Sequence, residues 1–429
     1  MKKFVWLVWG IVTLSIVGFF AYTLLQAENK DVLLIGDATY GHYQIELACD
    51  TCHTDAFGGP EVIQGACEGC HQAELDAAHD SHPKKKFTDP RNADRLEILD
   101  ARFCTTCHTE HQKEQTHAMG LTIPEDYCFH CHQEIGEERK SHEALGYESC
   151  ASAGCHNYHD NRALYEKFLV EHANEPWLKA MDRIIAPAAV SVTARAELDK
   201  RPHLQVQTDK PHQDSSFYHA AQGVGCQGCH RAANEAGPGW VAAPGVEVCA
   251  QCHVSETEGY QSGRHGMRLA QGMPALRPEQ TSGVFRDDAS HYEHGCNSCH
   301  VAHDYDADFA GTGACLTCHA DDHSLAYSAS PHASLENRGM AEKDVSCATC
   351  HMPATAIEVN GEQWVSVEHN QNLNLRPNEK MIRSVCMDCH GVQFALNALA
   401  DETLIRNNFS GQPDVHIPSI EWALERDRP

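Results

Sequence analysis

Basic residues are scarce in this chain. It has 33 lysines and arginines against 60 aspartates and glutamates, which gives a formal net charge of −27 at pH 7. A surface of this sign repels phosphate backbones, so the composition excludes nucleic acid as a partner. A partner protein with a basic surface would instead be attracted to this anionic chain. Aromatic residues are also few, at 7% of the chain.

Long apolar runs are absent, with one exception at the N-terminus. Residues 4–25 carry no charge and follow Lys2 and Lys3. The run is long enough to cross a bilayer as one helix and longer than the apolar core of a cleaved signal peptide. Residues 25–27 match a small-x-small cleavage site poorly, which argues against cleavage by signal peptidase. They contain no cysteine, which argues against a lipoprotein.

We therefore predict that residues 1–27 form an uncleaved transmembrane anchor, with a cleaved signal as the alternative. The two lysines keep the N-terminus in the cytoplasm. The chain after Glu28 is then exported, and we expect it in a bacterial periplasm, anchored to the inner membrane. If the segment is cleaved, the protein is soluble in the periplasm or extracellular.

No cysteine stands outside one repeated pattern. All 22 cysteines form pairs, and a histidine directly follows the second cysteine of every pair. Ten pairs read C-x-x-C-H, and the fifth reads C-x₄-C-H. We number these sites 1 to 11 in chain order: Cys49/Cys52/His53, Cys67/Cys70/His71, Cys104/Cys107/His108, Cys128/Cys131/His132, Cys150/Cys155/His156, Cys226/Cys229/His230, Cys249/Cys252/His253, Cys296/Cys299/His300, Cys315/Cys318/His319, Cys347/Cys350/His351 and Cys386/Cys389/His390.

C-x-x-C-H is the attachment sequence of a c-type haem. The two thiols add to the two vinyl groups of the porphyrin, and the histidine that follows ligates the iron. Zinc sites pair C-x-x-C units without needing a histidine after each one. The disulfides of exported proteins have no such need either. The sequence therefore predicts eleven covalently bound c-type haems.

Enough histidines remain to give every iron a second imidazole. The chain has 31 histidines, so twenty lie outside the motifs. Where a histidine follows a motif by three residues, it reaches a neighbouring iron more easily than its own; a surface or propionate-binding role is the alternative. The distal ligands that we expect are His111, His159, His265, His303, His332 and His369.

The motifs fall into two clusters, at 49–156 and 226–390. We predict a pentahaem domain at 28–160, a helix and linker at 161–215, and a hexahaem domain at 216–429. About 37 residues for each site are too few to wrap every haem in its own apolar core, so the haems must form the core. No segment has a clear sheet pattern. The expected fold class is mostly α with extensive coil and little or no sheet.

Both clusters resemble known haem proteins. Residues 42–160, with their CHxxH histidines and C-x₄-C-H site, resemble the class III tetrahaem cytochromes, electron carriers with two histidines on each iron. Residues 216–395, with VSCATCHMP and CAQCHVSETEGYQSGRHG, resemble the cytochrome c nitrite reductase and hydroxylamine oxidoreductase group. By that resemblance His265 and His369 would be distal ligands. The chain lacks the C-x-x-C-K motif of the nitrite reductases, so shared haem packing is implied more than shared catalysis.

Two functions remain open at this point. The first is a membrane-anchored periplasmic cytochrome that carries electrons from a quinol-linked donor to a periplasmic or outer-membrane acceptor, where a basic redox protein would be a suitable partner. The second is a reductase of a small nitrogen or sulfur compound, such as nitrite or hydroxylamine, with one five-coordinate haem in the hexahaem domain. Its pocket residues would come from Tyr218, Tyr260, Arg264, Tyr292 and His294, with haem packing as the alternative role. Arg264 and Arg268 would bind a small anion, with propionate binding or a surface position as the alternative. Assembly into a cytochrome filament is a third possibility, and the oligomeric state stays open.

Overall fold

The structure is a computed structural model of the chain. It describes residues 2–25, 27–55, 58–116, 120–139, 142–143, 146–147, 150, 158–160, 219, 223–230, 240–281, 283–301, 303, 309–333, 345–359, 362–375, 378–418 and 420–421. The predicted helix and linker at 161–215 therefore lie outside the described residues. So do Cys155 and His156 of site 5.

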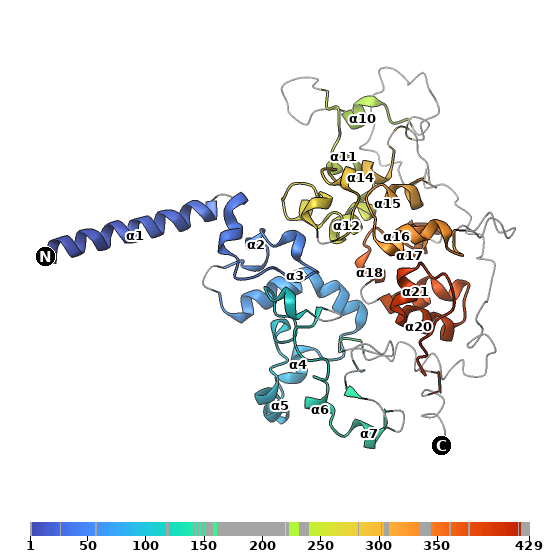
Figure 1. The fold of residues 1–429 in the computed structure, drawn as a ribbon, viewed down its shortest axis with the longest axis horizontal. Coiled ribbons are helices and arrows are strands. Elements are labelled where there is room, and N and C mark those ends of the chain that lie inside the picture. The colour runs from blue at the N-terminus through green and yellow to red at the C-terminus, as the bar shows by residue number, and fades with distance from the viewer. Residues whose placement is uncertain are drawn as a thin grey trace.

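Helix α1 (Lys2–Leu25) projects from the rest of the molecule as one rod (Figure 1). Its large side chains are exposed, with Phe4 at 69% and Leu14 at 74%. The stretch Lys2–Thr23 is long and apolar enough to cross a membrane. The described residues bury none of its most apolar stretch, and an apolar helix left uncovered in this way needs another apolar environment. Both a membrane anchor and a signal sequence fit this helix.

The N-terminal block, residues 27–160 as described, is built from short helices. The longest, α3, starts with Pro60 at its first position and ends where His79 adopts a left-handed conformation, with φ of 54°. Proline at the first turn and a left-handed residue after the last turn are typical helix ends. The helices of this block are α2 (Cys49–Cys52), α3 (Pro60–Ala78), α4 (Lys84–Phe87), α5 (Ala93–Ile98), α6 (Phe129–His132) and α7 (Ile135–Glu138).

The C-terminal block, residues 219–421 as described, repeats this style. Its helices are α10 (Cys226–His230), α11 (Val246–Cys249), α12 (Val254–Ser262), α13 (Met267–Ala270), α14 (Cys296–Cys299), α15 (Ala314–Leu316), α16 (Asp322–Ala326), α17 (Cys347–His351), α18 (Asn372–Leu375), α19 (Met381–Ser384), α20 (Val392–Ala400) and α21 (Glu402–Arg406). A hairpin of β1 (Ala354–Val359) and β2 (Glu362–Val367) pairs antiparallel, from Ala354↔Val367 to Val359↔Glu362. The prediction of a mostly α fold with extensive coil and little sheet is confirmed.

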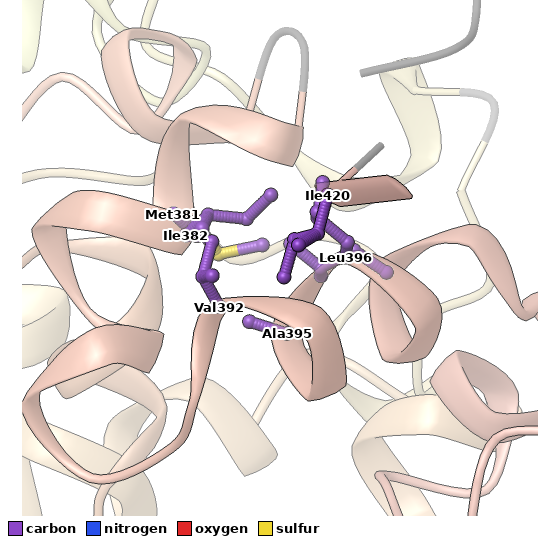
Figure 2. Packing of buried hydrophobic residues seen from close by; sticks show 7 residues of the cluster. Met381, Ile382, Val392, Ala395, Leu396 and Ile420 are labelled. Atoms are coloured by element: carbon purple, nitrogen blue, oxygen red, sulfur yellow. The ribbon is translucent and has the colours of Figure 1, made fainter. Parts of the chain in front are cut away.

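Apolar protein packing is concentrated near the C-terminus. Figure 2 shows side chains from α19, α20 and the segment around Ile420 meeting in one cluster. Ile382 and Val392 are fully buried there, and the cysteines Cys350 and Cys386 pack against the cluster. Elsewhere in the described residues, large apolar side chains are seldom buried. A fold of this size with so small an apolar core needs another source of cohesion, and covalently attached groups can supply it.

Candidate haem sites

Most of the described motifs fold into a single helical turn, and site 2 lies inside the longer helix α3. In these turns the histidine N–H donates to the carbonyl oxygen of the first cysteine, at 2.8 Å from His53 to Cys49 and at 2.9 Å from His300 to Cys296. Residues at i, i+3 and i+4 share one face of such a turn. Both thiols and the imidazole therefore point the same way, as attachment of a porphyrin and binding of its iron require. No disulfide joins any two of the described cysteines.

None of the described attachment cysteines lies in a fully enclosed protein core. Cys70 is exposed, and the others are partly buried, among them Cys131, Cys252, Cys318 and Cys389. Each of these five is the second cysteine of its motif, and each acts electrostatically on a nearby cysteine or tyrosine. This partial exposure agrees with the expectation that the polypeptide is too short to wrap every site in its own apolar core. Partial exposure suits a thiol that must be reached to form a covalent bond, and their attachment role stays a prediction.

No cluster of three or more histidines, cysteines or carboxylates within the described ranges is placed to hold a metal ion directly. The predicted iron ligands do not need such a cluster, because the porphyrin nitrogens supply the other bonds to a haem iron. The relevant geometry is a pair of imidazoles on opposite sides of one iron.

The structure describes the motif histidine of ten sites, and at nine of these a second histidine faces it. An imidazole nitrogen binds a first-row metal at about 2.0 Å, so two imidazoles on opposite sides of one iron have ring centres about 6 Å apart. The observed separations match that value. With the motif histidine first, the pairs are His71–His42 (5.9 Å), His108–His159 (6.4 Å), His132–His82 (6.2 Å), His230–His303 (5.8 Å), His253–His219 (6.1 Å), His300–His369 (6.2 Å), His319–His265 (6.2 Å), His351–His323 (6.1 Å) and His390–His332 (6.2 Å).

Five of the six expected distal histidines lie in these pairs, and each faces a site other than the one it follows. His159 follows site 5 but faces His108 of site 3. His303 follows site 8 but faces His230 of site 6. His111 is different, because no ring contact joins it to a motif histidine among the described residues. Its Nδ1 lies 2.9 Å from the carbonyl oxygen of Gly36.

Sequence reasoning missed four histidines that complete the pairs: His42, His82, His219 and His323. One signal was available for two of them. His42 and His219 each stand seven residues before the first cysteine of their block. Each faces the second site of that block, His71 and His253 respectively. Both blocks therefore begin with the same local arrangement.

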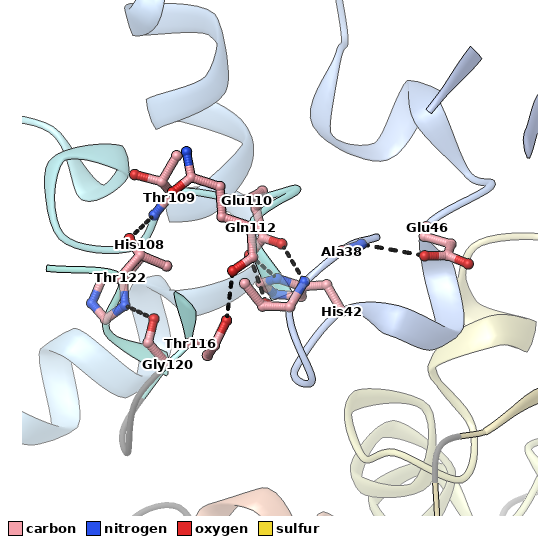
Figure 3. Close-up of polar contacts among 11 residues, drawn as sticks. Ala38, His42, Glu46, His108, Thr109, Glu110, Gln112, Thr116, Gly120 and Thr122 are labelled. Carbon is pink, nitrogen blue, oxygen red and sulfur yellow. Dashed lines mark hydrogen bonds and ion pairs between the residues drawn. The ribbon is translucent and has the colours of Figure 1, made fainter. Parts of the chain in front are cut away.

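Oxygen acceptors hold many of these imidazoles by Nδ1. At site 2, His71 lies 2.9 Å from Glu74, and His42 lies 2.6 Å from Glu110 (Figure 3). At site 3, His108 bonds to the carbonyl of Gly120 at 3.0 Å. The same kind of contact occurs from His82 to Tyr158, His159 to Asp80, His230 to Val241, His323 to Ile405 and His369 to Val367. A ring whose Nδ1 carries the proton presents a bare Nε2, which is the atom that binds a metal.

Burial keeps several of the rings uncharged. It lowers the pKa of His332 and of His351 to about 4. A neutral imidazole is the form that coordinates iron, so these rings are ready to bind at neutral pH. At Glu110, burial by itself would raise the pKa, but hydrogen bonds from His42 and Thr39 bring the pKa below its usual value. This carboxyl is therefore ionised at neutral pH.

Consecutive sites within a block are neighbours. A hydrogen bond between the thiols of Cys67 and Cys104 joins sites 2 and 3, and it is the main cause that raises the pKa of Cys67. The same contact joins the first cysteines of sites 7 and 8, Cys249 and Cys296. Tyr127 interacts with cysteines of both site 3 and site 4. Similar cysteine contacts or electrostatic interactions join sites 1 and 2, 4 and 5, 6 and 7, 8 and 9, 9 and 10, and 10 and 11. Each block thus arranges its sites as a connected row.

Among the described residues proposed for an open catalytic site, Tyr260, His294 and Arg268 are engaged in contacts with other parts of the protein. The Tyr260 hydroxyl donates to the carbonyl oxygen of His294 at 3.1 Å. The His294 ring stacks on His265 with ring centres 4.3 Å apart, too close to hold an iron between them, and His265 already faces His319. Tyr292 is 64% exposed. Arg268 is buried and donates to backbone carbonyls, and Tyr218 lies outside the described residues.

Comparisons with known proteins place the chain in a broad class. Residues 41–133 match the family Cytochrome c3, and residues 219–258 match the family Doubled CXXCH motif. No curated protein and no solved structure matches the chain. Together with the motifs, these matches identify a multihaem c-type cytochrome, a class that binds haem iron and transfers electrons. The resemblance of residues 216–395 to the nitrite reductase and hydroxylamine oxidoreductase group stays a prediction.

Proposed function

We propose that this chain is a membrane-anchored periplasmic cytochrome with eleven covalent haems. It would take electrons from a quinol-linked donor and deliver them to a periplasmic or outer-membrane acceptor. One observation carries the proposal: all six motif histidines of the C-terminal block face a second imidazole at 5.8–6.2 Å. Bound haem supplies one-electron exchange, and two strong ligands on its iron leave no position for a substrate.

The chain's own residues would hold each group at three or four points. The two cysteines of a motif would fix the porphyrin, and the motif histidine would bind one side of the iron. The facing histidine would bind the other side, oriented by its Nδ1 contact. This assignment gives distal roles to nine histidines: His42, His82, His159, His219, His265, His303, His323, His332 and His369.

A regular pairing rule supports His111 as the distal ligand of site 1. The histidine three residues after site 5 faces site 3, and the one three residues after site 8 faces site 6. Both therefore face the site two positions earlier in the chain. His111 follows site 3 in the same way, which assigns it to His53. The Gly36 carbonyl at its Nδ1 orients it as the other distal rings are oriented.

The anionic surface and α1 support the remaining parts of the proposal. A net charge of −27 favours a basic redox partner, which electrostatic attraction would bring to the surface rapidly. The exposed apolar helix supports attachment to the inner membrane next to a quinol-linked donor. The alternative reductase needs an open iron in residues 216–429, and the imidazole pairs there argue against one.

The test is an EPR spectrum of the fully oxidised, haem-loaded protein at neutral pH. We expect only low-spin ferric signals, because two imidazoles produce a strong ligand field. The variant His332→Ala calibrates the measurement, since removal of one imidazole of site 11 should add one high-spin signal. A high-spin signal near one haem equivalent in the unmodified protein would contradict the proposal. Nitrite and hydroxylamine would then be tested as substrates.

A further inference from the structure

The two rows of sites do not meet end to end in space. In Figure 1, α6 of site 4 and α7 lie at one end of the molecule, and α10 of site 6 lies at the opposite end. Helices α2 and α3, which carry sites 1 and 2, lie between them. Sequence order would join the last site of the N-terminal block to site 6. The arrangement of the described helices favours a different connection.

Site 1 contacts the segment that carries the facing histidine of site 9. Thr51 lies inside the first motif, and its Oγ1 donates to Oε1 of Gln271 at 2.9 Å. Gln271 directly follows α13, which begins two residues after His265. His265 is the imidazole that faces His319 of site 9. A motif of the N-terminal block therefore contacts the support of a site in the C-terminal block.

Arg268 of α13 ties the same segment to the support of site 2. This side chain is charged but only 9% exposed, so it needs hydrogen-bond partners inside the protein. Its Nη1 donates to the carbonyl oxygen of Gln44 at 2.7 Å, and its Nε donates to that of Pro274 at 3.2 Å. Gln44 stands two residues after His42. The fold of the C-terminal block thus depends on a carbonyl of the N-terminal block.

Lys380 adds an electrostatic interaction between the blocks to these two hydrogen-bonded contacts. It is half-buried, and burial lowers its pKa, while the carboxylates of Glu74 and Asp160 act to raise it. Glu74 is the residue that holds Nδ1 of His71 at site 2. Lys380 directly precedes Met381, which lies in the cluster that packs on cysteines of sites 10 and 11 (Figure 2). One lysine therefore links site 2 to the last two sites of the chain.

From the hydrogen bonds of Thr51 and Arg268, with the electrostatic interaction of Lys380 beside them, we infer that electrons pass between the blocks at a junction of sites 1 and 2 with sites 9 to 11. The inference rests on the proposed electron-transfer function and deepens it. Sites 3 to 5 and sites 6 to 8 then form two arms that lead away from the junction. An electron that enters at the N-terminal block therefore reaches a site near the end of the chain before it reaches site 6.

Arrival times at two electron traps test this order. Glu138, exposed on α7 beside His132 of site 4, is replaced in Glu138→Cys, and a ruthenium photosensitiser is attached to the new thiol. On excitation, the complex gives one electron to the protein and is re-reduced by a sacrificial amine. The traps are His303→Met at site 6 and His332→Met at site 11, made in separate chains. Methionine in place of one imidazole raises the potential of a site, and a redox titration verifies each trap beforehand.

We expect the trap at site 11 to be reduced several-fold faster than the trap at site 6. Arrival at site 6 first, or at both together, would overturn the inference. If neither trap receives an electron from the label, the electron-transfer function itself fails. As a second measurement, Lys380→Met should slow arrival at site 11, and Lys85→Met, the same change at an exposed lysine of α4, serves as its control. Equal slowing in both variants would also overturn the junction.

Discussion

Replacement of Glu110 by glutamine should raise the reduction potential of site 2. The Glu110 carboxylate lies 2.6 Å from Nδ1 of His42 and also accepts from the backbone and hydroxyl of Thr39 (Figure 3). Glu74 holds the other imidazole of the same site. Two anionic acceptors stabilise the extra positive charge of ferric iron, so site 2 should have the lowest potential in the protein.

The size of the effect follows from Coulomb's law. A metal bound by the opposite nitrogen of His42 would lie roughly 6.5 Å from the carboxylate oxygen, given a metal–nitrogen bond of about 2.0 Å. At an effective dielectric constant of about 20, one charge at that distance contributes about 2.5 kcal/mol. For a one-electron couple this equals roughly 110 mV. Because the Glu110 side chain is 29% exposed, solvent reduces the value, and we expect a rise of about 50–100 mV.

Spectroelectrochemical titration of the full haem-loaded chain measures the shift. In Glu110→Gln, the absorbance step contributed by one haem should shift from the lowest potentials of the titration curve to a higher potential. Glu61→Gln is the matched control, because Glu61 is exposed and pairs with Lys84 instead of a histidine. A titration curve of Glu110→Gln that overlays the unmodified protein would refute the assignment of His42 to an iron.

Four further outcomes are expected. His111→Ala should keep the haem content and add one high-spin EPR signal at site 1; a purely low-spin spectrum would exclude His111 as its ligand. Ile382→Ala, in the fully buried cluster, should lower the free energy of unfolding by about 2–4 kcal/mol in chemical denaturation. Asp401 accepts hydrogen bonds from three backbone N–H groups, which lower its pKa. Its carboxylate therefore stabilises the fold at pH values above the pKa of the unfolded state, near 3.8. The stability deficit of Asp401→Ala should therefore be full at neutral pH and vanish as the pH falls through the folded pKa. Replacing residues 1–27 with a cleavable signal should move the protein from the membrane to the soluble fraction after carbonate washing, unless α1 is already removed in the cell.

The haem attachment sites could be read from the sequence because their chemistry is local. Two thiols and an imidazole within five residues form one turn, and the turn itself orients them. For the same reason the apolar N-terminal run predicted α1 without any tertiary information. The mostly α fold followed from the short spacing between motifs, which leaves room for little more than helical turns and loops. The β1–β2 hairpin was not predicted, although the sequence offered a signal for it, because an Asn-Gly pair stands between Val359 and Glu362.

The facing histidines were decided by tertiary structure, since each one pairs with a motif distant in the chain. The CHxxH pattern identified His159 and His303 as candidates, but only the fold shows which site each one faces. His82 and His323 carry no local signal at all, because only packing brings them to His132 and His351. The junction between the blocks is likewise invisible in the sequence. The contacts of Thr51 and Arg268 and the electrostatic interaction of Lys380 join residues that are hundreds of positions apart, and no local spacing rule relates such residues. Covalent attachment is thus determined by neighbours along the chain, and the choice of axial partner and electron route by neighbours in space.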